Sequence, residues 1–205
     1  MSNLSSVGKE TLETVSLFLV DGAAKTPRCW IGRREDWEMS PRTTSDRICS
    51  QYQANHIPMY EAVFREVGFR LPFSPLHVGV FEWFEICPSQ LDPSWFAYLK
   101  AFDLVCRFLR LPINIELFFI IFTIQRGLDK DGGCGLVSIR QRQVLFEAFT
   151  IGSLKLEFFL VRPRTKVALS NVLKVVERPH ADVGAVSTRV PGFPFCWTKD
   201  HFKHT

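Results

Sequence analysis

The stretch Phe73–Arg110, FSPLHVGVFEWFEICPSQLDPSWFAYLKAFDLVCRFLR, contains two helix starts of the same kind. Ser74-Pro75 and Asp92-Pro93 each place a side-chain oxygen just before a proline. The oxygen can accept a hydrogen bond from an unpaired amide of the first turn, and a proline at the first helical position has no amide to satisfy. Because dense apolar residues follow both starts, the sequence predicts two packed helices here, over 75–84 and 93–109.

Further elements are predicted on both sides of this stretch. Apolar spacing of three and four residues predicts short helices over 60–67, 116–125 and 166–176. The run 116–125 is apolar enough that a buried strand is the alternative. Segments rich in β-branched and aromatic residues predict two or three short strands, at Leu136–Arg140, Val144–Phe149 and Leu156–Val161. The expected fold class is mainly α with a small β element (α+β). It has a compact core of four or five helices, followed by these strands and an extended tail.

Length and composition favour one domain with a sizeable core. The chain has 205 residues, of which 46% are hydrophobic and 22% are charged. Residues 1–56, with scattered Gly, Pro and charges, are expected to form a poorly ordered N-terminal arm, parts of which pack through Trp30 and Trp37. Residues 57–198 are expected to form the domain, and 199–205 a tail.

Cysteine spacing and apolar runs indicate an intracellular protein. No two of the six cysteines are close enough to form a CxxC pair, so reduced thiols are expected. No basic segment precedes the apolar run Val15–Val20, so no signal peptide is expected. The longest apolar run, Leu117–Ile124, is far shorter than the ~20 residues of a membrane span. We therefore expect no membrane partner, with cytoplasm and nucleus both open.

No catalytic motif is present, and we expect no enzyme, no cofactor and no metal site. Phosphate-loop, GxSxG, HExxH and dinucleotide fingerprints are all absent. Cys196, His201 and His204 are metal ligands by type, but no second closely spaced pair accompanies them. A Ser or Cys nucleophile beside one of the five histidines stays open, because spatial neighbours are not visible in a sequence. No small-molecule substrate is identified.

Basic residues form the candidate contacts to a partner. One polar stripe lies on the predicted helix 93–109, and two basic pairs follow later in the chain. The candidates are Lys100, Arg107, Arg110, Arg140, Arg142, Arg162 and Arg164. A contact with RNA or DNA is one interpretation, and a solvated surface is the other. The formal net charge of +4 favours the second interpretation.

Two spaced blocks carry a family resemblance. Gly68–Pro75, GFRLPFSP, and Cys87–Trp95, CPSQLDPSW, resemble the N-terminal, gag-like domain of plant Ty3/gypsy-type retrotransposons, often labelled a gypsy-type transposase. Later blocks follow in the same order, at Leu117–Phe119, Leu145–Phe149, Lys155–Val161 and Phe193–Thr198. The resemblance covers about 58–198. Ser94, Leu154 and Glu157 depart from the usual pattern.

The resemblance implies a non-enzymatic gag-like module that acts through self-association or RNA contact. The family has no established active site, so no catalytic residue is carried over. The alternatives are a remnant of a DNA-acting transposase or nuclease, or a non-functional relic. A nuclease would require Glu82, Glu85, Asp92 and Asp103 to converge on a metal site.

Overall fold

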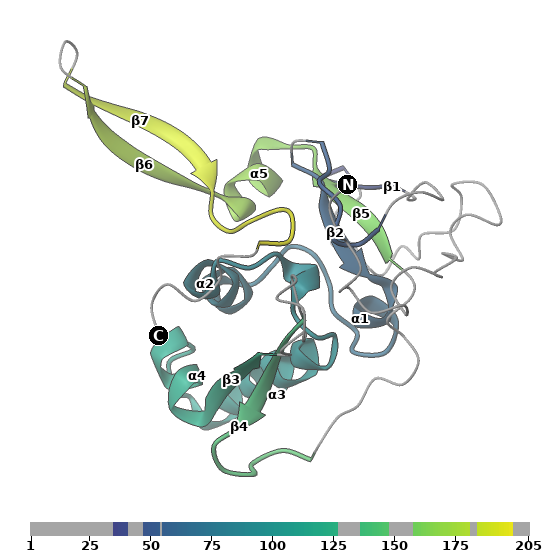
Figure 1. Ribbon diagram of the computed structural model, residues 1–205. Coiled ribbons are helices and arrows are strands. Elements are labelled where there is room, and N and C mark those ends of the chain that lie inside the picture. The colour runs from purple at the N-terminus through teal and green to yellow at the C-terminus, as the bar shows by residue number, and fades with distance from the viewer. Residues whose placement is uncertain are drawn as a thin grey trace.

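The computed structural model describes residues 35–40, 47–53, 55–126, 136–147, 158–180 and 184–198 (Figure 1). These residues form five α-helices, one 3₁₀ helix and seven strands, which pair in three antiparallel sheets. The expected fold class, mainly α with a small β element, is therefore wrong. The described part of the chain combines five α-helices with three small antiparallel sheets, so the fold is an α+β mixture. The predictions for Trp30, Leu154, Glu157, His201 and His204 lie outside the described residues.

A three-stranded sheet brings two early segments of the chain together with a segment about one hundred residues later. Its central strand is β5 (Phe158–Pro163), with β1 (Trp37–Ser40) on one side and β2 (Ile57–Tyr60) on the other. The antiparallel register aligns Trp37 with Pro163 and Ile57 with Val161. Five of the six residues of β5 are buried, which suits its apolar run Phe158–Val161, and the exception is Arg162. The strand predicted at Leu156–Val161 is thus confirmed over 158–161.

The stretch Phe73–Arg110 folds into α2 (Pro75–Phe84), a 3₁₀ turn η4 (Pro88–Gln90) and α3 (Ser94–Leu109). The bounds of α2 are those predicted. The Ser74 hydroxyl accepts a hydrogen bond from the His77 amide at 3.3 Å. At α3 the Asp92 carboxylate accepts from the Ser94 amide at 3.0 Å, so Asp92 caps the first turn, as predicted. The helix itself begins at Ser94, one residue later than predicted.

Both helices end in a left-handed residue that is not glycine. Glu85 follows α2 with φ 52°, and Arg110 follows α3 with φ 55°. The next amides then reach back: Ile86 donates to the Phe81 carbonyl at 3.1 Å, and Leu111 donates to the Cys106 carbonyl at 2.8 Å. This geometry satisfies carbonyl groups that the helix itself leaves unpaired.

The predicted helix over 116–125 is right only in its first part. The helix α4 (Ile115–Ile121) is followed without a break by strand β3 (Phe122–Arg126), which pairs with β4 (Val137–Gln141). Strand β4 confirms the strand predicted at 136–140. Residues 144–147 form no strand, and 148–149 lie outside the described residues. The short helix α1 (Glu61–Arg65) confirms the helical pattern near 60–67, although Tyr60 belongs to β2.

The predicted helix over 166–176 also changes into a strand. The helix α5 (Lys166–Val172) leads directly into β6 (Leu173–His180), which pairs with β7 (Gly184–Pro191). The spacing that suggested a helix continued into Val175 and Val176, whose β-branched side chains favour a strand once a partner strand is present. Figure 1 shows this hairpin projecting from the body of the molecule, with α5 at its base.

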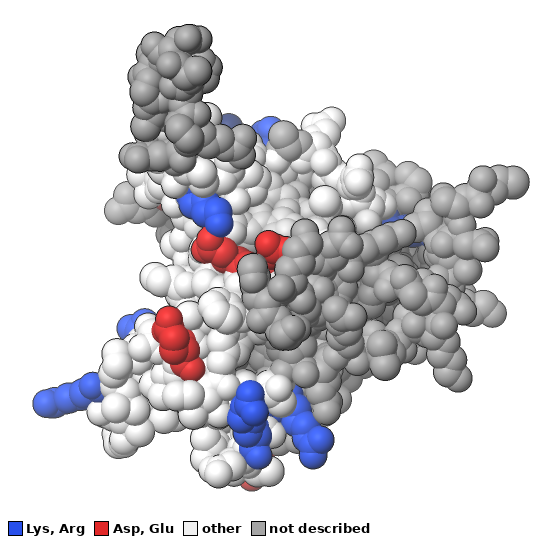
Figure 2. Space-filling model, turned by 60° about the vertical axis from the view of Figure 1, so that its left-hand side comes forward, with Lys and Arg blue, Asp and Glu red and all other residues white. Residues whose placement is uncertain are grey.

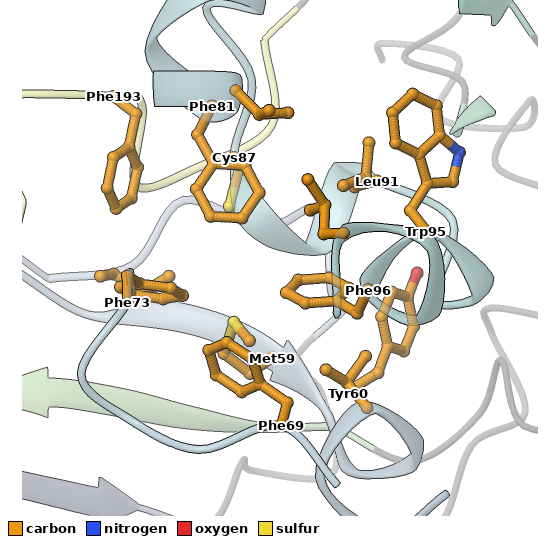
Figure 3. Packing of buried hydrophobic residues seen from close by; sticks show 14 of the residues in the cluster. Met59, Tyr60, Phe69, Phe73, Phe81, Cys87, Leu91, Trp95, Phe96 and Phe193 are labelled. Atoms are coloured by element: carbon orange, nitrogen blue, oxygen red, sulfur yellow. The ribbon is translucent and has the colours of Figure 1, made fainter. Parts of the chain in front are cut away.

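The core is an aromatic cluster centred on Phe73. The Phe73 ring packs against Trp37, Phe69, Phe81 and Phe193, with ring centroids 5.6 to 6.0 Å apart. Figure 3 shows side chains from β2, α2, α3 and the C-terminal segment converging on this cluster. The stretch Phe73–Arg110 therefore forms the centre of the fold.

Two findings bear on the expected environment of the chain. Cys87, Cys106 and Cys196 are free thiols, and Cys29 and Cys134 lie outside the described residues. No helix in the described part of the chain combines the length and the apolar character needed to cross a membrane.

Candidate functional site

A small pocket lies between α3 and the connection from α1 to α2. Its volume is about 170 Å³, which is below the size of a typical ligand cavity. Both apolar and polar residues line it: Val67, Gly68, Phe69, Arg70, Pro72, Ser74, His77, Phe96, Lys100 and Asp103. The polar groups are largely engaged by the protein. Lys100 donates to the Val67 carbonyl at 2.8 Å, and Asp103 accepts from the Arg107 guanidinium at 2.8 and 3.2 Å.

Ser74 and His77 lie side by side in the way that a catalytic serine and its histidine base do. The Ser74 hydroxyl lies 2.5 Å from His77 Nδ1. Burial among aromatic rings lowers the pKa of His77 to about 4, so the imidazole is neutral near pH 7. However, the same hydroxyl caps α2, and no residue in the described part of the chain bonds the second ring nitrogen of His77. The described geometry is therefore that of a helix cap.

Three of the four acidic residues required for a nuclease have separate partners. Glu82 pairs with Lys174, Asp92 caps α3, and Asp103 pairs with Arg107. Over the described ranges, no group of three or more His, Cys, Asp or Glu side chains could hold a metal ion. The convergence that the nuclease alternative requires is therefore missing from the described residues.

The seven predicted basic contacts fall in three separate places. Lys100 and Arg107 lie on α3, and Arg110 directly follows it. The other four are Arg140 in β4 with Arg142 just after it, and Arg162 in β5 with Arg164 just after it. Several are engaged by protein groups, since Arg162 pairs with Glu38 and Arg142 donates to the Phe119 carbonyl at 3.3 Å. On the face shown in Figure 2, the charged side chains are of both signs and lie scattered over a largely uncharged surface, and its coloured part shows no continuous basic patch.

The turn η4 has a role that no sequence signal predicted. Gln90 is fully buried and pairs with both backbone groups of Thr198: its amide nitrogen donates to the carbonyl at 2.7 Å, and its oxygen accepts from the amide at 3.1 Å. The Trp197 indole also donates to the Ser89 hydroxyl at 2.9 Å. Cys87–Trp95 and Phe193–Thr198, two blocks of the family resemblance, thus bind each other. Their role in this fold is structural.

The C-terminal half of α3 carries an exposed apolar surface. We define the α3 apolar surface by its members: Leu104, Val105, Phe108, Leu109, Leu111 and Ile113. Phe108 is 86% exposed, and Leu104 and Leu109 are each 56% exposed. Apolar spacing along the helix predicts that Leu109 shares one packed face with Trp95 and Cys106. This prediction is wrong, because α4 begins only at Ile115 and α3 packs against it through Phe102 and Phe118, which leaves Leu109 exposed. Leu104 and Phe108, and Val105 and Leu109, are each one helical turn apart, so their exposed side chains are neighbours on α3, and the surface is a candidate interaction site.

No protein-family model, curated protein or solved structure matches this chain.

Proposed function

We propose that this chain is a non-enzymatic, retrotransposon-derived gag-like module whose role is to assemble with copies of itself. The observation that carries the proposal is the α3 apolar surface, which brings six large apolar side chains of one helix end and the following loop to the solvent. Fully burying one Leu or Phe side chain stabilises an interface by about 1.5–3 kcal/mol. Association itself costs about 4–15 kcal/mol in lost freedom of the two chains, so a stable interface has to cover most of this surface on both copies.

Assembly fits the described residues better than RNA contact does. Lys100, Arg107, Arg142 and Arg162 are held by carbonyl or carboxylate groups of the protein. Releasing them for phosphate would cost those hydrogen bonds. The resemblance to a gag-like domain supports a second copy as the partner, and the structural roles of Ser74, Ser89 and Gln90 account for its most distinctive blocks without catalysis.

The experiment is sedimentation analysis of the full chain over a range of concentrations. We expect species larger than a monomer, and we expect Phe108→Ser to lower the average mass. Val144→Ser is the matched control, because Val144 is equally exposed, at 87%, but lies after β4. A monomer at every concentration would overturn the proposal. A monomer that binds single-stranded RNA strongly at low salt and weakly at high salt would favour RNA contact instead.

A further inference from the structure

The β6–β7 hairpin has two strand edges that differ in what they offer to a partner. Over the described ranges its contacts with the rest of the fold are at its base. Val172 accepts from the Gly192 amide at 2.8 Å, and Lys174 pairs with Glu82. Figure 1 shows the remainder standing clear of the body. A two-stranded hairpin is only marginally stable on its own in water, so an arm of this length is a candidate for pairing with a further strand.

The ladder shows which backbone groups face outward. The Gly192–Val172 bond continues the register in which Val176 pairs with Thr188. Hydrogen-bonded and non-hydrogen-bonded pairs alternate along an antiparallel ladder. Every second pair counted from Val172–Gly192 is therefore hydrogen-bonded within the hairpin: Lys174–Val190, Val176–Thr188 and Arg178–Val186. The outward-facing residues are then Val175, Glu177 and Pro179 on β6, and Ala185, Ser187 and Arg189 on β7.

The two edges are therefore unequal. Pro179 has no amide proton, and the β6 sequence also carries three charged residues, which together discourage pairing at an edge. On β7, each of the three outward residues has an amide proton, and the only charged residue in 184–190 is Arg189. Both prolines of the hairpin, Pro179 and Pro191, occupy outward positions, which agrees with this assignment.

We propose that the β7 edge pairs antiparallel with the β7 edge of a second copy, centred on Ser187, to form a four-stranded sheet across a two-fold axis. The proposal rests on the proposed function of self-assembly and names one of its interfaces. With Ser187 opposite its own copy, Ala185 lies opposite Arg189, so all three outward residues of each strand meet outward residues of the other. This register satisfies six backbone hydrogen bonds and places no like charges opposite each other.

The charge of the hairpin agrees with a protein strand as its partner. Residues 173–191 contain Lys174, Arg178 and Arg189 against Glu177 and Asp182, a net charge of 3 − 2 = +1 with His180 neutral. A ribbon that tracks phosphates needs a denser basic stripe. Two separate two-fold contacts on one chain, at β7 and at the α3 apolar surface, produce assemblies larger than a dimer.

The test compares Ser187→Pro with Glu177→Pro in the full chain. These residues face each other in one pair of the hairpin, and neither amide serves the hairpin ladder, so both prolines perturb the hairpin equally. Only Ser187→Pro blocks the β7 edge. We expect Ser187→Pro to reduce the assembly to dimers, and the double variant Ser187→Pro, Phe108→Ser to be monomeric, while Glu177→Pro keeps the wild-type mass.

Crosslinking provides a measurement that does not depend on a proline. In the proposed sheet the two copies of position 187 have Cα atoms about 5.5 Å apart, within disulfide range, whereas the two copies of position 177 are about 14 Å apart. Ser187→Cys should therefore form a 187–187 crosslink under mild oxidation, located by peptide mapping, and Glu177→Cys should form none.

The outcomes separate the two proposals. Wild-type mass for Ser187→Pro, equal losses for both proline variants, or no 187–187 crosslink would overturn the β7 pairing while leaving self-assembly in place. This includes the case in which β7 pairs with a strand of a different protein. A wild-type chain that stays monomeric overturns self-assembly and the β7 pairing together.

Discussion

Asn171 on α5 hydrogen-bonds both backbone groups of Phe73, almost one hundred residues earlier in the chain. Its side-chain oxygen accepts from the Phe73 amide at 3.0 Å, and its side-chain nitrogen donates to the Phe73 carbonyl at 2.8 Å. The residue at the centre of the aromatic core is thus held in place through its main chain by the helix at the base of the hairpin. Ring packing and backbone pairing act on the same residue.

We predict that Asn171→Asp lowers the free energy of unfolding by about 1–3 kcal/mol. The carboxylate can still accept from the Phe73 amide, but it cannot donate to the carbonyl, and it places a negative charge beside it. Urea unfolding followed by circular dichroism measures the change. Ser170→Ala, at the exposed neighbouring position, is the control and should change stability by less than about 0.5 kcal/mol.

We predict that the protein loses stability on acidification because of the buried His77. Burial lowers the pKa of His77 from 6.5 to about 4. Between these values the unfolded chain binds a proton that the folded chain does not, so stability present above pH 6.5 is lost as the pH falls toward 4. We expect this histidine to account for roughly 2–3 kcal/mol of that loss.

The measurement is the unfolding free energy of wild type and His77→Asn from pH 7.5 to 4. The asparagine can place a polar atom near Nδ1 but does not titrate, so the variant should show the flatter profile. His56→Gln supplies the background for removing a histidine elsewhere. Parallel profiles for wild type and His77→Asn would contradict the prediction.

We predict that the substitution Tyr60→Phe stabilises the protein. Its hydroxyl is buried and has no hydrogen-bond partner among the described residues, and burial raises the pKa of this phenol. Tyr60→Phe removes an unsatisfied polar group and should raise the unfolding free energy by up to about 1 kcal/mol.

The gain of Tyr60→Phe should grow above pH 10, where the unfolded tyrosine ionises and the folded one does not. Tyr98→Phe, in a half-buried ring beside Phe122, is the comparison. A loss of more than about 1 kcal/mol in Tyr60→Phe at neutral pH would show that the hydroxyl has a partner.

We predict that a second substitution, Arg110→Gly, also stabilises the protein. Its φ of 55° lies in the left-handed region, which a residue with a Cβ atom adopts at a cost of about 1 kcal/mol. Arg110→Gly should recover about 0.5–1 kcal/mol in urea unfolding. Arg110→Ala removes the same charge but keeps the Cβ atom, so it should give no gain. Equal effects of the two substitutions would assign the change to charge.

The sequence predicted correctly those elements that are determined by residues within one or two turns of each other. The Ser74-Pro75 cap placed α2 with the correct bounds, because a cap and a proline act within one turn. The helix predicted over 166–176 failed after Val172, since its strand half depends on pairing with 184–191, which apolar spacing does not reveal. Strand β3 was missed for the same reason: its partner β4 lies beyond residues 127–135.

The structural sites required contacts that no local pattern encodes. Gln90 meets Thr198 and Asn171 meets Phe73 across about one hundred residues, and a buried amide side chain carries no sign of which peptide it will bind. The α3 apolar surface was misread for a related reason. The sequence shows that Leu104, Phe108 and Leu109 are apolar, but whether another element covers them depends on where α4 begins.

The order of strands in the first sheet has a consequence for synthesis. Strands β1 and β2 are complete by Tyr60, but β5, which lies between them, begins at Phe158. A ribosome adding ~5–20 residues per second needs about 5–20 s to bridge that interval. During it, both strands of the nascent chain lack the partner that separates them, so a chaperone that shields the emerging N-terminal segment would have its effect within this window.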